Sequence, residues 1–167
     1  MVTIKTITTP LGEMCAGATN AGICLLDFCD SKALNRDLVV LPKAMKTTVA
    51  EGEHPYIAQL EQQLSEYFAG KRKAFDLPLV LQGTAFQQDV WRTLQTIPYG
   101  TTISYQAQAL QMGKPKSVRA VANANGTNRI SIVIPCHRVI GTNGQLTGFG
   151  GGLWRKERLL KLETENH

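Results

Sequence analysis

Cys136 is the residue of this chain whose surroundings point most directly to chemistry. It lies in the segment Pro135-Cys136-His137-Arg138, directly after an apolar run at residues 130–134. A thiolate is a nucleophile, an imidazole can act as a base, and a nearby cation favours the thiolate. A cysteine that only packs in a core needs no such neighbours. The segment therefore predicts a nucleophilic cysteine whose reaction is decided by the rest of the chain.

His137 is the candidate base closest in sequence to Cys136, and the only other histidines are His54 and His167. Neighbouring residues on a strand point to opposite faces, so a contact between this thiol and this imidazole needs an irregular backbone or a bridging water. Pro135 favours such an irregularity. A base also needs an orienting partner. The residues alone do not choose that partner, but Glu163 is one of only four acidic residues in residues 84–167.

Positive charge is concentrated in the half of the chain that contains Cys136. Residues 1–83 hold 8 Lys/Arg and 9 Asp/Glu, a net of −1, and residues 84–167 hold 10 Lys/Arg and 4 Asp/Glu, a net of +6, which together make +5. This asymmetry favours a polyanionic partner for the second half. A basic face that only keeps the protein in solution is the alternative that charge leaves open.

The other cysteines, Cys15, Cys24 and Cys29, raise the question of a metal site with His54. Their spacing matches no zinc finger or knuckle, which usually contain tight pairs of cysteines. We interpret them as half-buried strand cysteines and expect neither a metal nor a cofactor. The first residues lack a signal-peptide pattern, and no apolar run approaches the roughly 20 residues that span a bilayer. These features predict a cytoplasmic protein that does not enter a membrane.

The first half of the chain predicts strands followed by a helix. Alternating residues at 2–7 and an apolar segment at 23–28 indicate strands, and residues 31–54 are less regular. Apolar residues at helical spacing predict a helix over 55–69, with Gly70 at its C-terminal cap. Residues 75–81 have an extended pattern.

The second half predicts a helix-turn-helix. Thr84 and Gln87 fit a capping box at the start of a first helix. Two short helices at 104–110 and 115–124 follow, joined near Gly113, with Pro115 suited to the first turn of the second one. A plain helical hairpin is the alternative. DNA is favoured by the basic residues on or beside the second helix, which are Lys114, Lys116 and Arg119.

Small residues and glycines suggest two further features. The second of these helices carries Ala120, Ala122, Ala124 and Gly126, which would let its backbone approach a narrow groove. Residues 148–152 are rich in glycine but lack the spacing of a phosphate-binding loop, so we interpret them as a mobile loop beside the site. A last helix is predicted over 153–163.

At this point the sequence resembles one family. The segment around Cys136 resembles the active-site signature of the O6-alkylguanine-DNA alkyltransferases, the methylated-DNA–protein-cysteine methyltransferases, in their stand-alone form. The similarity covers most of the second half and, more weakly, the first. The landmarks at family spacing include residues 84–100, Ser104-Tyr105-Gln106, Gly113-Lys114-Pro115-Lys116, Val118-Arg119-Ala120-Val121, Asn128 and Lys156-Glu157-Arg158-Leu159-Leu160.

This resemblance implies DNA repair by direct reversal. Cys136 would accept the alkyl group from O6 of guanine, with O4-alkylthymine as a further candidate substrate, and the thioether would make the protein a single-turnover enzyme. His137 would help to deprotonate Cys136 through a water, and Glu163 would orient His137. Asn128 would stabilise the turn around the cysteine.

The resemblance also implies how DNA is bound. The second helix of the helix-turn-helix would lie in the minor groove of double-stranded DNA that contains O6-alkylguanine. Arg119 would fill the gap left by the flipped guanine and Tyr105 would help to rotate the nucleotide out, with Gln106 and Lys114 as further DNA contacts. The substrate pocket would include two departures from a common family pattern, Phe149 where many members have tyrosine and Gly150 where some have serine.

The resemblance implies a protein with two domains that acts as a monomer. An α/β domain, RNase H-like with antiparallel strands plus a helix, would occupy residues 1–80. A mainly helical domain with a winged-helix-like helix-turn-helix would occupy residues 81–167. A lesion-sensing DNA-binding protein without transfer is the main alternative, but such relatives lack the acceptor cysteine. A cysteine hydrolase would need a distant histidine, for which only His54 is available, and would leave a basic helix-turn-helix without a role.

Overall fold

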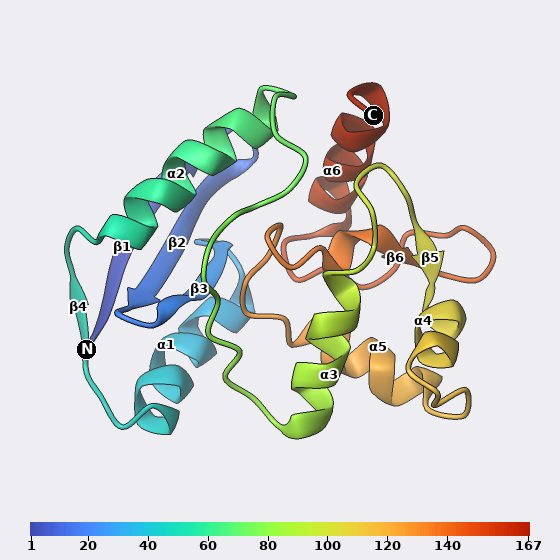
Figure 1. Cartoon of the computed structure of the whole chain (residues 1–167), viewed down its shortest axis with the longest axis horizontal. Coiled ribbons are helices and arrows are strands. Elements are labelled where there is room, and N and C mark those ends of the chain that lie inside the picture. Colours follow the sequence, from blue (N-terminus) through green and yellow to red (C-terminus); the bar gives the residue numbers. More distant parts are fainter. The chain divides into compact units, whose positions relative to one another are not determined.

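The computed structural model describes residues 1–167, which divide into the units Met1–Gln82 and Gly83–His167 (Figure 1). The first unit is built on a sheet. In it, β1 (Val2–Thr9), β2 (Gly12–Thr19) and β3 (Gly22–Phe28) form an antiparallel meander. A short strand, β4 (Val49–Glu51), pairs in parallel with β1, so the strand order is β3-β2-β1-β4. The expected strands at 2–7 and 23–28 are confirmed.

Gly22 lets a distant segment join the edge of this sheet. Its φ is +148°, and a Cβ there would lie 2.4 Å from the carbonyl oxygen of Pro78. The close approach allows the Ile23 N–H to donate to Pro78 O and the Val80 N–H to donate to Ile23 O, both at 2.8 Å. We expected residues 75–81 to be extended. In the structure this segment pairs with the sheet through a single parallel bridge, between Ile23 and Leu79.

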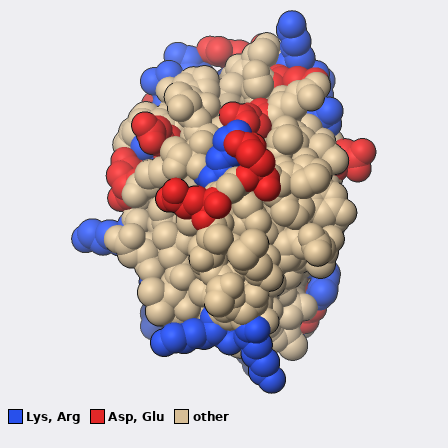
Figure 2. Space-filling view, turned by 90° about the vertical axis from the view of Figure 1, so that its left-hand side faces the viewer, with Lys and Arg blue, Asp and Glu red and all other residues tan.

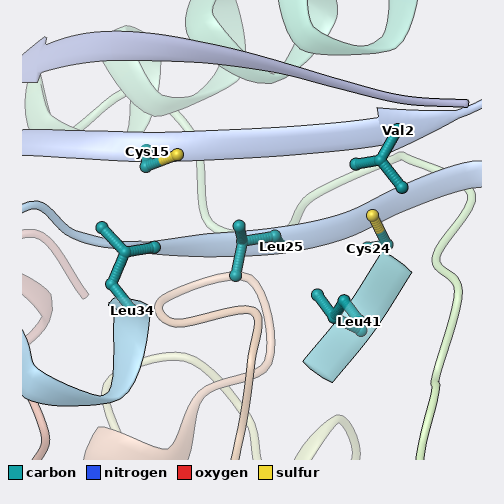
Figure 3. Close-up of a cluster of buried hydrophobic side chains, with 6 residues drawn as sticks. All are labelled: Val2, Cys15, Cys24, Leu25, Leu34 and Leu41. Atoms are coloured by element: carbon teal, nitrogen blue, oxygen red, sulfur yellow. The ribbon is translucent and has the colours of Figure 1, made fainter. Parts of the chain in front are cut away.

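A helix that the sequence did not predict, α1 (Lys32–Ala44), follows β3. The hydroxyl of Ser31 caps its start by accepting a hydrogen bond from the Ala33 N–H. Leu34 and Leu41 are buried and, as Figure 3 shows, point from α1 toward side chains of the sheet. The buried cluster that they join contains Val2, Cys15, Cys24 and Leu25. The expectation that residues 31–54 are less regular is therefore wrong for 32–44, where Pro42 and two neighbouring valines weaken the helical pattern in the sequence.

The helix expected at 55–69 is confirmed as α2 (Pro55–Phe68). The side chain of His54 is its N-cap and accepts a hydrogen bond from the Tyr56 N–H at 3.1 Å. Its buried face consists of Ile57, Leu60, Leu64 and Tyr67. His54 thus serves as a helix cap, and the structure contains no group of three or more His, Cys, Asp or Glu side chains that could hold a metal ion.

The second unit is mainly helical. It contains α3 (Ala85–Leu94), α4 (Tyr105–Gln111), α5 (Val118–Gly126) and α6 (Leu153–Glu165), with a single 3-10 turn at Cys136–Arg138. Two short strands, β5 (Ile103–Ser104) and β6 (Val139–Ile140), pair in parallel. The predicted capping box of Thr84 and Gln87 is present at the start of α3. None of the helices in the chain has the length and apolar character that a membrane span would require.

The helix-turn-helix consists of α4 and α5. Buried amide groups join the two helices, because Gln108 and Asn125 exchange hydrogen bonds of 3.0 and 2.6 Å. The expected start of the second helix at Pro115 was wrong, since α5 begins at Val118. Pro115 instead follows Lys114 in a turn closed by a 2.9 Å hydrogen bond from the Ser117 N–H to Lys114 O, a position where its restricted φ is favoured.

Candidate active site

Cys136 begins the 3-10 turn and is half-buried. Its N–H donates to Ile134 O at 2.8 Å across Pro135, whose φ of −83° and ψ of 66° make an inverse γ-turn. The irregular backbone that Pro135 favours is therefore present. Three residues of one tight turn now carry the thiol, the imidazole and the guanidinium.

The segment before the cysteine is a strained turn held by Asn128. The buried, β-branched Ile132 has a φ of +72°, a conformation that costs of the order of 1–3 kcal/mol. Asn128 Nδ2 donates to Ile134 O at 2.8 Å, and Asn128 Oδ1 accepts from the Ile130 N–H at 3.0 Å. One side chain thus ties both ends of the turn together, directly before Cys136.

His137 and Glu163 form a buried pair. The imidazole is fully buried, the carboxylate is 1% exposed, and His137 Nε2 lies 2.6 Å from Glu163 Oε2. Arg138 also binds this carboxylate, with Nε at 2.8 Å and Nη2 at 3.1 Å, while its Nη1 donates to Ile97 O. The Gly100 N–H adds a fourth contact at 3.2 Å. The carboxylate is therefore surrounded by donors.

These contacts decide the charge of both groups. Burial alone would raise the pKa of Glu163, but the hydrogen bonds and charges of His137 and Arg138 outweigh it and hold that pKa well below its ordinary value. Burial lowers the pKa of His137, and the partly opposing attraction of Glu163 does not reverse this. The pair is thus a neutral imidazole beside an ionised carboxylate.

The tautomer of His137 follows from that charge state. An ionised carboxylate only accepts hydrogen bonds, so the proton of the neutral imidazole lies on Nε2. The other nitrogen, Nδ1, carries a lone pair and has no hydrogen-bond partner within the protein. A buried acceptor of this kind is able to take up a proton.

Lys156 is a candidate site residue to which the sequence analysis assigned no role, although it lies in one of the family landmarks. It is fully buried, and its Nζ donates to Thr147 O at 2.6 Å, where the Tyr105 hydroxyl also donates at 3.0 Å. Burial lowers the pKa of Lys156, and the charge of Cys136 acts against that shift. Burial likewise raises the pKa of Tyr105, with Cys136 adding to the effect. Both side chains are thus electrostatically coupled to the thiol.

The signal for Lys156 was present in the helical spacing. Lys156, Leu159 and Glu163 are three and four residues apart and lie on the buried face of α6. A lysine and a glutamate at core positions of an amphipathic helix require partners, which marks both for a site. The helix predicted at 153–163 is confirmed as α6.

The glycine-rich loop ends at α6, whose first turn holds it. Arg155 Nη1 donates to Gly151 O at 3.0 Å, and the Gly152 N–H donates to Phe149 O at 2.9 Å. Phe149 is half-buried and Gly150 is exposed. Both predicted pocket residues therefore lie in a loop that is held to α6 at its two ends. At one end Thr147 O accepts a hydrogen bond from Lys156 of α6, and at the other end the loop continues into α6 itself.

Of the predicted DNA contacts, only Tyr105 takes part in the network around Lys156, through its hydrogen bond to Thr147 O. Gln106, Lys114 and Arg119 are all exposed, on α4, in the turn and on α5. The Lys114 Nζ lies 5.6 Å from the centre of the Phe86 ring. On α5, Ala120 and Gly126 are exposed whereas Ala124 is buried, so only part of the small-residue set faces outward.

The three cysteines of the first unit have a different character. Burial raises the pKa of Cys15 and of Cys24 to about 11, and it also raises the pKa of the exposed Cys29. None of the four cysteines forms a disulfide bond. The thiols of the first unit are thus held in the protonated, less nucleophilic form.

Comparisons with known proteins agree with this site. Residues 85–165 match the DNA binding domain, and residues 2–81 the ribonuclease-like domain, of 6-O-methylguanine DNA methyltransferase. A methylated-DNA–protein-cysteine methyltransferase of Mycolicibacterium paratuberculosis is 43% identical over 163 residues, covering 98% of this chain and 93% of that protein. One from Methanosarcina barkeri is 41% identical, covering 96% of both chains.

A solved structure gives the same result in three dimensions. The crystal structure of Mycobacterium tuberculosis OGT in complex with DNA has a TM-score of 0.84 and 40% identity, covering 98% of this chain and 94% of that one. The expected α/β first domain and mainly helical second domain are confirmed by these matches. The chain belongs to the methylated-DNA–protein-cysteine methyltransferase family.

Proposed function

We propose that this chain repairs DNA by transferring the alkyl group of O6-alkylguanine to Sγ of Cys136. The observation that carries the proposal is the adjacent, fully buried His137, whose Nε2–H is bound by an ionised Glu163 while Nδ1 keeps a lone pair. The names of the relatives and the DNA complex of the similar structure support the reaction class and the partner.

The transfer is a displacement at carbon. The thiol proton of Cys136 passes through a water to His137 Nδ1, and Arg138 and Glu163 hold the imidazole in the required tautomer. The thiolate attacks the alkyl carbon, the bond from that carbon to O6 breaks, and its electron pair goes to the guanine, which takes up one proton. The products are a thioether on Cys136 and an unmodified guanine.

The thioether makes the reaction stoichiometric. Sulfur bound to two carbons is a poor leaving group, so Cys136 is not regenerated and one molecule repairs one base. The proposal also takes the protein to act as a monomer, which carries one acceptor thiol, Cys136. A reducing, cytoplasmic location is part of the proposal and agrees with four cysteines that form no disulfide bond.

Two further groups complete the site. Lys156, buried and coupled to the charge of Cys136, favours the thiolate. Asn128 keeps the strained turn at Ile132 in place, so that Cys136 is presented at its end. Phe149 and Gly150 belong to the loop that lines the base pocket in this proposal. The tyrosine hydroxyl that Phe149 lacks weakens polar contact to the guanine, and the glycine at position 150 leaves room for alkyl groups larger than methyl.

DNA reaches this site by nucleotide flipping. A group on O6 of a stacked guanine is out of reach for a protein in the minor groove, so the nucleotide must rotate out of the helix. The exposed small residues Ala120 and Gly126 allow α5 to approach that groove, and Arg119 fills the gap left in the stack. Tyr105 assists the rotation, and Gln106 and Lys114 contact the DNA.

Intact mass spectrometry after incubation with a duplex that contains one O6-methylguanine tests the proposal. We expect a single gain equal to one methylene group, located on the peptide with Cys136, and no gain in Cys136→Ser. Cys29→Ser is the matched control and should gain the same mass as the wild type. Tight binding to the lesion without a mass gain would identify a lesion sensor and overturn the proposal, as would turnover without an adduct.

A further inference from the structure

The outer edge of β1 is open over half of its length. β4 pairs only with Val2, Thr3 and Ile4. On that side the Val2 N–H donates to Thr48 O at 2.8 Å, and Ile4 O accepts from the Gly52 N–H at 3.0 Å. Since the direction of backbone hydrogen bonding alternates along a strand, the next groups on this side belong to residues 6 and 8.

Thr6 and Thr8 therefore direct their backbone N–H and C=O groups past the end of β4. Both residues are exposed, and the hydrogen bonds of the neighbouring loop stop at Gly52. An open strand edge of this kind is a template on which another extended segment can pair.

Two cavities follow the open edge. One of about 380 Å³ is lined by Lys5, Thr6, Glu51 and Glu53 among others. The other, of about 480 Å³, extends from Thr8 across to α2, where its lining residues include Leu64 and Phe68. A helix lying beside an open edge provides one wall for an added strand. The apolar side chains of α2 form a pocket that can hold one side chain of that strand.

The charge at this edge is acidic. Lys5 is the one cation among the residues that line the two cavities, and it is already paired with Glu53 at 3.2 Å and Glu61 at 3.3 Å. Glu51 adds a third carboxylate, so these four side chains carry a net charge of −2. The side chains of Glu53 and Glu61 remain 79% and 46% exposed. Figure 2 shows a face of the molecule on which acidic side chains gather around basic ones.

We propose that the open edge of β1 binds an extended, basic segment of a partner protein by strand addition. Thr6 and Thr8 supply backbone hydrogen bonds. Lys5 pairs with Glu61 of α2, so the face of β1 that carries Lys5 and Ile7 is turned to this helix. A lysine or arginine of the added strand lies near Glu53 and Glu61, and an apolar residue at an alternate position enters the cavity beside Leu64.

The charges also decide between occupants. A second copy of the chain would bring the same three glutamates against each other, and like charges directly opposite one another are destabilising. A nucleic acid would also be repelled, because its phosphates carry the same negative charge as these glutamates. All the residues involved lie in the first unit, so this interaction is separate from the transfer assigned to Cys136, and either can fail without the other.

Hydrogen exchange of the full chain with a short peptide tests the proposal. The peptide has blocked ends and carries one lysine and one leucine two positions apart, with threonine between them and on both sides. Binding should slow hydrogen exchange of the Thr6 and Thr8 amides by about tenfold or more, because new interstrand hydrogen bonds protect them. A peptide with glutamate in place of lysine is the control and should leave these amides unchanged. Equal protection by both peptides would overturn the charge argument, and no protection by either would overturn the proposal.

Two sets of variants locate the interaction. Thr8→Pro removes an outward N–H that the sheet does not use, and should weaken binding about tenfold or more, whereas Thr8→Val keeps that N–H and should bind like the wild type. Glu61→Gln should weaken binding and reduce its salt dependence, with the exposed Glu157→Gln of the second unit as control. Unchanged binding in both Thr8→Pro and Glu61→Gln would overturn the proposal. Dimerisation of the chain without peptide, lost in Thr8→Pro, would assign the edge to a second copy instead.

Discussion

Replacing Glu163 by glutamine removes a charge while keeping the shape of the side chain. The carboxylate accepts from His137 Nε2 at 2.6 Å, from Arg138 Nε and Nη2 at 2.8 and 3.1 Å, and from the Gly100 N–H at 3.2 Å. Every neighbour is a donor. A glutamine has one accepting oxygen and one donating nitrogen, so in either orientation its NH₂ group faces a donor.

Both orientations have a defined cost. If the NH₂ group faces His137, the imidazole must move its proton to Nδ1, and the lone pair that would receive the thiol proton is lost. If it faces Arg138 Nε and Gly100, the guanidinium loses its shortest hydrogen bond to this side chain. Breaking a buried ion pair costs roughly 3–5 kcal/mol of stability. Loss of a general base lowers a rate by about 10²- to 10⁴-fold.

Single-turnover transfer from a duplex with O6-methylguanine and urea unfolding measure the two effects separately. Glu163→Gln should lower both the rate and the free energy of unfolding by the amounts given. Glu165→Gln, exposed on the same helix, should change stability by no more than about 0.5 kcal/mol and leave transfer unchanged. A Glu163→Gln protein that transfers within about threefold of the wild-type rate would refute the role of this carboxylate in setting the tautomer.

Three further outcomes follow from the same structure. Burial lowers the pKa of His137 below its ordinary 6.5, so the unfolded chain takes up a proton first and urea unfolding should show stability falling as the pH drops below 6.5. The lowered pKa of Glu163 adds a further loss below about 4.5. Stability that is flat from pH 7 to pH 4.5 would contradict the shift of His137, and no further loss below pH 4.5 would contradict the shift of Glu163. Arg119→Ala should slow repair of duplex DNA by about tenfold or more but leave the reaction with free O6-benzylguanine unchanged; equal slowing of both would place Arg119 in the chemistry instead. Gly22→Ala should destabilise the protein by more than about 1 kcal/mol, because its Cβ would meet Pro78 O, whereas Gly126→Ala, with open space around it, should be neutral or stabilising; urea midpoints compare the two.

Features that depend on neighbouring residues could be predicted from the sequence. The capping box of Thr84 and Gln87, the start of α2 at Pro55 and the helix-turn-helix all follow from local backbone preferences. The helix α1 was missed because Pro42 obscured its pattern, and its formation relies on burying Leu34 and Leu41 against the sheet. The start of α5 was placed too early because Pro115 suits a turn as well as a first helical turn.

The sequence by itself determined the Cys136-His137 pair, for which we propose the roles of nucleophile and base, and the basic half of the chain, because these follow from residue types and their positions along the chain. Only the tertiary structure decided how the base is held. His137 and Arg138 meet Glu163 across 26 and 25 residues, and Gly100 reaches it across 63. The burial of Lys156 and the open edge of β1 could not be predicted from the sequence either. Such pairings depend on where distant segments pack, and it is their desolvation that sets the tautomer of His137 and the charge beside Cys136.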